Sequence, residues 1–399
     1  MNNTLYQYQI DRGLISPNKI LLFVLFPLGV ALFIYWYFQG SQKEVPQRSG
    51  KTGIKKCYKL SDIVPVDQNF QWDTSEPIKS LPFKNGPYKL TMGIRSLDIQ
   101  DWLLIGPSYL NMINNKKKIV TNNHPDYPAD KDLAKNTVFL TAEAVPAIRE
   151  FYLTVVEYLC RKYPMIFEKG NDVVYNRITG DRIPLVADGK EEYKQYLIYL
   201  ARTIEEDFII LLKDPSRESE ENGTEYYFKG GVFAFAAGFN PRDRFDTPLS
   251  FIHHPIPGYE QKLKLSMNRF FDKIEPGQFV TRNNFSVQTH NKLYVDDNNK
   301  GHNLGKDEIQ EPLDIKDLDF DKQVHYRSER QVLTKLSESG AVIFTIRTYL
   351  MPMSDLKREG PEVCERFIGA INGLPDDIAY YKRAKEWGPP VIEYLLQPF

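Results

Sequence analysis

The chain has 399 residues, enough to bury a large core as one domain of about 300 residues or as two interleaved lobes. Its 51 basic and 52 acidic side chains nearly cancel, which gives no support for nucleic-acid binding. The three cysteines are Cys57, Cys160 and Cys364. They form no C-x-x-C pair, so they argue against a disulfide-stapled secreted protein and cannot supply the four thiolates of an iron–sulfur cluster.

A long apolar segment lies near the N-terminus. Residues 20–38, ILLFVLFPLGVALFIYWYF, carry no charge and have the aromatic run Tyr35-Trp36-Tyr37 near their end. Their length suits the hydrocarbon core of a bilayer, and the aromatic end suits its interface. The sequence therefore predicts a single transmembrane anchor behind a tail of residues 1–19. Two basic residues precede the segment and five follow it by residue 56, so the positive-inside rule predicts a cytosolic C-terminal part on the endoplasmic reticulum or another endomembrane.

The next region is polar and then becomes periodic. Residues 39–80 are basic and broken by prolines, which is typical of a linker. A strand followed by a capped turn is expected between Tyr88 and Trp102. The spacing of apolar residues predicts amphipathic helices over residues 142–167 and 191–212, and residues 213–224 are expected to form an exposed loop.

The second half of the chain alternates between strand and helix signals. Residues 226–239 are expected to form a β-hairpin that turns at Gly230-Gly231. A short helix over residues 263–271, a strand over 279–287 and a polar loop over 296–323 follow. In the C-terminal 45 residues we expect two helices, because Pro361 suits the first turn of one and Asp376-Asp377 the start of the other.

The most distinctive stretch is His325–Pro352, HYRSERQVLTKLSESGAVIFTIRTYLMP. Its first half places Leu333 and Leu336 at a helical spacing and favours a charged surface helix. Its second half, residues 341–350, is rich in β-branched and aromatic residues and indicates a buried strand. Arg347 lies inside this strand, and a buried guanidinium requires an anionic partner.

The pattern R-x-E-R-Q-x-L followed by S-G-A-V-I-F-T-I-R-T-Y resembles the signature of the haem-dependent oxidative N-demethylase alpha-subunit-like family, whose fungal members have been called HRQ proteins. Met92-Gly93 ahead of Asp101-Trp102 extends the resemblance, which covers roughly residues 80–355. Leu336-Ser337-Glu338-Ser339 departs from the family's Leu-Pro-x-Ser. The resemblance implies an α+β, PAS-like mixed sheet with flanking helices over residues 81–355, and we expect a helical extension over residues 356–399.

The resemblance also implies haem b as the cofactor, and haem iron requires an axial ligand in an apolar, rigid wall. His253 follows Phe251-Ile252 and precedes two prolines that restrict the backbone. Ile252 to Pro257 matches the family's Ile-His-x-Pro-Val-Pro block, which selects His253 over His254 as the metal ligand. His325 is the second candidate, for the iron or its distal side, whereas His124, His290 and His302 are expected to be ordinary surface residues.

Haem propionates require cationic partners. The candidates for cofactor binding are Arg282, Arg330 and Arg347, besides His253, and the alternative is that these arginines balance acids inside the fold. Gln331 is expected either to orient a bound oxygen species or to close a core hydrogen bond. The candidate catalytic residues are therefore His325, Gln331 and Arg330.

These features predict a membrane-anchored haem oxidoreductase of the monooxygenase type that demethylates a small amine with O2. The sequence contains no dinucleotide-binding G-x-G-x-x-G after a strand, so electrons are expected from a separate NAD(P)H-dependent reductase or electron-transfer protein. Two alternatives stay open. One is a luminal glycosyltransferase that uses Asp296-Asp297 for a metal, which glycosylation at the Asn222 sequon would support. The other is a non-enzymatic haem or ligand sensor.

Overall fold

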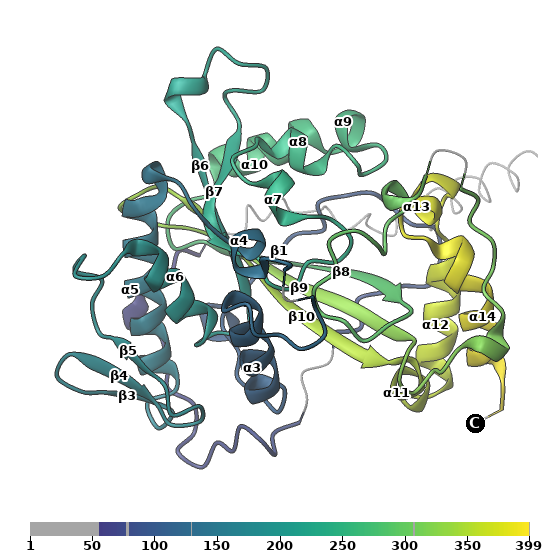
Figure 1. Ribbon diagram of the computed structural model, residues 1–399, viewed down its shortest axis with the longest axis horizontal. Coiled ribbons are helices and arrows are strands. Elements are labelled where there is room, and N and C mark those ends of the chain that lie inside the picture. Colours follow the sequence, from purple (N-terminus) through teal and green to yellow (C-terminus); the bar gives the residue numbers. More distant parts are fainter. Residues whose placement is uncertain (1–55, 77–79, 129, 306–307, 399) are drawn as a thin grey trace, which may run out of the picture. The chain divides into compact units, whose positions relative to one another are not determined.

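An antiparallel sheet of seven strands forms the centre of the computed structural model, which describes residues 56–76, 80–128, 130–305 and 308–398 (Figure 1). The strand order is β1-β8-β9-β10-β6-β7-β2. The strands are β1 (Arg95–Ser96), β2 (Val138–Leu140), β6 (Asp207–Lys213), β7 (Tyr226–Val232), β8 (Phe279–Gln288), β9 (His325–Lys335) and β10 (Val342–Pro352).

The two faces of this sheet are covered by different helices. One face packs against α3 (Tyr109–Val120), α5 (Val145–Lys162) and α6 (Tyr193–Ala201), where Phe208 and Ile343 join the largest hydrophobic cluster. Strand side chains alternate between faces, so Ile209 and Ile346 belong to a second cluster on the opposite face. That cluster is covered by α8 (Leu249–His253), α9 (Tyr259–Lys262) and α10 (Lys264–Lys273), which lie together at the top of Figure 1.

The remaining elements close the ends of the sheet. A third cluster joins Tyr326 of β9 and Met353 to the C-terminal helices α11 (Met353–Arg358), α12 (Pro361–Asn372), α13 (Asp376–Tyr381) and α14 (Ala384–Leu396). The short helices α4 (Leu133–Thr137) and α7 (Pro241–Arg244) lie between longer elements. A separate small sheet contains β3 (Phe167–Lys169), β4 (Val173–Asn176) and β5 (Arg182–Pro184).

Most long periodic elements are confirmed. The helices expected over residues 142–167 and 263–271 are α5 and α10, and the strands expected over 279–287 and 341–350 are β8 and β10. Pro361 and Asp376 each begin a helix, although α14 then adds a helix that the sequence reading did not separate. Cys160 is buried, as its place on the apolar side of a helix indicates.

Three predicted elements are wrong. The stretch at His325–Leu336 is not a helix, because β9 pairs with β10 along its whole length and with β8 from His325 to Thr334. The helix expected over residues 191–212 ends at Ala201, and the chain continues as β6. Gly230-Gly231 is not a hairpin turn. Here β7 continues as a strand paired with β6, with a register shift between Ile210 and Leu211. A Cβ on Gly231 would lie 2.1 Å from the Phe208 carbonyl oxygen, so the glycine permits a close strand approach.

The predicted fold class also needs correction. The α+β class is confirmed, but the sheet is antiparallel at every pairing of its described strands and is not mixed. The single-pass membrane architecture, with the membrane as a partner, is not supported: within the described residues no helix combines the length and apolar character needed to cross a bilayer. The segment 20–38 itself lies outside the described residues. The predicted domain boundaries at residues 80 and 355 stay predictions.

Candidate functional site

A cavity of about 230 Å³ lies between the sheet and the helices α8 to α10. Its floor comes from β6, β7, β8, β9 and β10, and its cover comes from α8, α10, α13 and adjoining loops. Most of the wall is aliphatic or aromatic, including Ile209, Phe228, Leu263, Phe271, Leu333 and Phe344. A concave apolar site of this kind, with a few converging polar groups, is the usual form of a cofactor pocket.

His253 is the last residue of α8 and lines this cavity. Its Nδ1 donates a hydrogen bond to the Leu249 carbonyl oxygen at 2.8 Å, which fixes the tautomer, and Nε2 forms no hydrogen bond with any residue that the structure describes. The ring stacks on Tyr259, with centroids 5.1 Å apart and planes inclined by 13°. Burial lowers the pKa of His253 to about 4. The imidazole is therefore neutral, rigid and presented to an apolar space, as a metal ligand requires.

Cationic side chains gather in the same cavity wall. Arg282 comes from β8, Lys300 from the loop after it and Lys382 from the end of α13. Burial lowers the pKa of Lys300 to about 8 and that of Lys382 to about 7, and it also lowers the pKa of Arg282. None of the three forms an ion pair with a described carboxylate. Instead, Lys382 donates to the Phe285 carbonyl oxygen at 2.5 Å, and Lys300 lies 5.5 Å from the centre of the Tyr381 ring.

A carboxylate also belongs to this wall. Glu329 of β9 accepts a hydrogen bond from the Gln331 amide at 2.8 Å, and its other oxygen lies 4.0 Å from Arg327 Nε. Glu329 and Gln331 stand across from Asn284 and Arg282 in the β8–β9 register, so all four side chains share one face of the sheet. Among the described cavity-lining residues Glu329 is the single carboxylate, beside the cations Arg282, Lys300, Lys382 and, further along the wall, Arg244.

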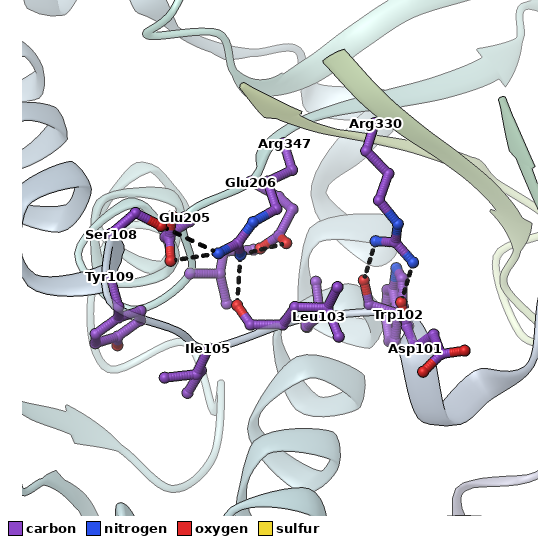
Figure 2. A network of polar contacts seen from close by, with 12 residues as sticks. Asp101, Trp102, Leu103, Ile105, Ser108, Tyr109, Glu205, Glu206, Arg330 and Arg347 are labelled. Carbon is purple, nitrogen blue, oxygen red and sulfur yellow. Dashed lines mark hydrogen bonds and ion pairs between the residues drawn. The ribbon is translucent and has the colours of Figure 1, made fainter. Parts of the chain in front are cut away.

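Two arginines singled out in the sequence lie on the other face. Figure 2 shows Arg347 directed at Glu205 and Glu206, whose Oε1 atoms lie 2.7 Å and 3.2 Å from the guanidinium. Arg330 donates to the backbone oxygens of Asp101 and Trp102. The need of Arg347 for an anionic partner is confirmed, and the fold itself supplies that partner. Neither arginine lines the cavity.

The other histidines differ in whether they line the cavity. His325 is buried at the start of β9, where its ring pairs with the Gln323 carbonyl oxygen at 2.9 Å, and it does not line the cavity. His254 is exposed next to His253. His302 was expected at the surface, and it is exposed at the cavity rim, stacked on Tyr381.

Lys300 and Lys382 were missed by sequence reasoning. Lys300 falls within a segment that reads as a polar loop, and Lys382 lies among the C-terminal helices, about 80 residues away along the chain. No local pattern distinguishes either of them from a surface lysine. Only a signal that joins distant residues in space would have found them.

Asp296 does not behave as a metal ligand. It accepts a hydrogen bond from Lys131 at 2.7 Å and another from the Tyr294 hydroxyl at 3.0 Å. Over the described ranges, no group of three or more His, Cys, Asp or Glu side chains is arranged to hold a metal ion.

A comparison with known families matches one model, "Haem-dependent oxidative N-demethylase, alpha subunit-like", over residues 93–392. The match covers well over half of the chain and includes most of the cavity lining, the central strands and most of the C-terminal helices. It also extends beyond residue 355, where the resemblance read from the sequence ended. The chain therefore belongs to the haem-dependent oxidative N-demethylase, alpha subunit-like family, and haem is its cofactor.

Proposed function

We propose that haem binds in the cavity between the sheet and α8 to α10, with His253 as its axial ligand. The observation that carries this proposal is the state of His253. Its pKa is depressed, its Nδ1 is fixed by a backbone carbonyl, and its Nε2 is available to the cavity. Iron binds a neutral imidazole nitrogen whose partner nitrogen is oriented by a hydrogen bond.

The other side chains of the cavity wall suit the porphyrin ring and its propionates. The apolar side chains suit a flat porphyrin, and the propionates suit Arg282, Lys300 and Lys382. Among the described residues these three cations form no ion pair with a carboxylate, although Glu329 attracts each of them electrostatically. Arg282 Nε is buried without a hydrogen-bond partner, which indicates a site built for a further group. A bound propionate would restore the charged form of the two lysines, because an opposite charge favours the ammonium ion.

The reaction that fits this site is oxidative N-demethylation of a small amine. The bound haem would supply the oxidative chemistry: O2, two electrons and two protons convert an N-methyl group to formaldehyde and leave the demethylated amine and water. Glu329, held by Gln331 and Arg327, would accept the N–H of the substrate amine. The apolar walls would exclude water from the reacting centre. We further propose a separate reductase as the electron source.

An absorption spectrum of the full-length protein with hemin tests the cofactor site. The wild type should show a Soret band, His253→Gly should lose or weaken it, and added imidazole should restore it. His254→Gly is the matched control, because that residue is exposed and adjacent, and its band should be unchanged. Equal spectra for the two variants would refute His253 as the ligand.

Formaldehyde release distinguishes the enzyme from a haem sensor. With a reductase, NADPH and a methylated amine, the enzyme should release formaldehyde, and Glu329→Gln should raise KM for the amine more than it lowers kcat. A haem-loaded wild type that releases no formaldehyde with any methylated amine would favour the sensor.

A further inference from the structure

A buried carboxylate lies behind the turn that carries His253. Glu225, just ahead of β7, is only 5% exposed. Its Oε2 accepts the Ser250 backbone N–H at 2.8 Å, and its Oε1 accepts the Ser250 hydroxyl at 2.6 Å and the Asn268 amide at 2.9 Å. Within the described part of the chain, Glu225 forms no ion pair with a lysine or arginine. Three hydrogen bonds hold its charge in place without neutralising it.

These contacts connect Glu225 to the imidazole in two steps. Ser250 is the second residue of α8, and it directly follows Leu249, whose carbonyl oxygen accepts the hydrogen bond from His253 Nδ1. Because α8 has only five residues, few hydrogen bonds of its own fix this turn. The anchoring of Ser250 by Glu225 therefore fixes the carbonyl group that orients the imidazole, while Tyr259 supports the ring face.

We infer that Glu225 is a positioning residue for the axial ligand and that its negative charge stabilises ferric over ferrous haem iron. This inference rests on the proposed role of His253. A fixed charge in an apolar interior is weakly screened, so it favours the iron state with the additional positive charge. Reduction of ferric haem adds one electron at the iron, and a nearby carboxylate opposes that step. Hydrogen bonding and burial around the ligand are established means of setting haem potentials.

Spectroelectrochemical titration of the haem-loaded full chain tests this inference. Glu225→Gln keeps the size of the side chain and removes the charge, so it should shift the ferric–ferrous equilibrium about tenfold toward ferrous, a rise of about 59 mV for a one-electron couple. Glu260→Gln is the matched control. Glu260 is an exposed glutamate paired with Lys264 at 3.0 Å, and its removal should change the equilibrium less than twofold.

A second variant separates position from charge. Ser250→Ala retains the carboxylate and the backbone hydrogen bond but removes the hydroxyl contact, so hemin should dissociate several-fold faster with little change in potential. An unchanged potential in Glu225→Gln would overturn the electrostatic role. If that variant does not fold, hemin dissociation from Ser250→Ala decides: faster loss supports the positioning role and unchanged loss overturns it. A wild type that takes up no hemin would instead refute the proposed cofactor site.

Discussion

The two faces of the central sheet differ in whether their buried cations form ion pairs with carboxylates. On the α5 face, Arg347 has two carboxylate partners, which outweigh the effect of burial and raise the pKa of the guanidinium. On the cavity face, Arg282, Lys300 and Lys382 have no such partner, and burial lowers the pKa of each. The first arrangement is complete within the protein, whereas the second would be completed by the haem propionates that we propose to bind there. A buried cation without an ion-pair partner is therefore a better indication of the candidate site than the number of charges in a region.

The largest expected change in stability comes from breaking the ion pairs of Arg347 with Glu205 and Glu206. Arg347→Met leaves Glu205 and Glu206 buried without their ion-pair partner, so the free energy of unfolding should fall by about 3–5 kcal/mol. Denaturant unfolding of the hemin-free chain measures this change. A loss below about 1 kcal/mol would show that the carboxylates find other partners or shed their charge by protonation.

The matched substitution on the cavity face should weaken hemin binding without destabilising the fold. Arg282→Met removes a cation that has no ion-pair partner among the described residues, so the hemin-free fold should be unchanged or more stable by about 1 kcal/mol. Hemin affinity should fall about tenfold or more, because a charge-assisted contact to a propionate is lost. Hemin titration and denaturant unfolding of the same variant check both parts. A destabilised fold with normal hemin affinity would reverse the assignment of the two faces.

The unpaired lysines of the cavity face should also make the stability of the hemin-free protein depend on pH. In the hemin-free protein the pKa of Lys382 is lowered to about 7 and that of Lys300 to about 8, below the ordinary value near 10.5. The unfolded chain therefore binds more protons between about pH 7 and 10.5, and the stability contributed by these groups rises with pH over that range.

Hemin affinity should change in the other direction. Propionates bind the ammonium form, which is present below about pH 7, so affinity should fall as pH rises through 7 to 8 and beyond. Titrations of hemin across this range measure the slope. Lys382→Gln should bind hemin more weakly and with a smaller slope, and an identical slope in that variant would remove Lys382 from the propionate site.

The smallest effect is expected at Arg330. This half-buried side chain donates to two backbone carbonyl groups and does not line the cavity. Arg330→Gln should cost about 1–2 kcal/mol of stability and leave hemin affinity unchanged. A tenfold weaker hemin affinity would restore Arg330 to the cofactor site.

The sequence by itself determined the family resemblance, the helices and strands whose apolar residues follow one clear periodicity, and His253 as a residue of interest, which lines the cavity. The amphipathic pattern of α5 and the β-branched residues of β10 required no distant information, since local propensity and burial agreed. Pro255 and Pro257 restricted the backbone beside His253, which made this histidine distinctive before any contact was known.

Tertiary structure alone decided which cations face the cavity. Strand β9 carries charges on both faces, and pairing with β8 and β10 places Glu329 and Gln331 in the cavity while Arg330 contacts the opposite side. Lys300 and Lys382 are brought together from a loop and from the C-terminal helices. Whether a buried charge is paired depends on contacts between residues far apart in the chain, and no local pattern of residues records those contacts.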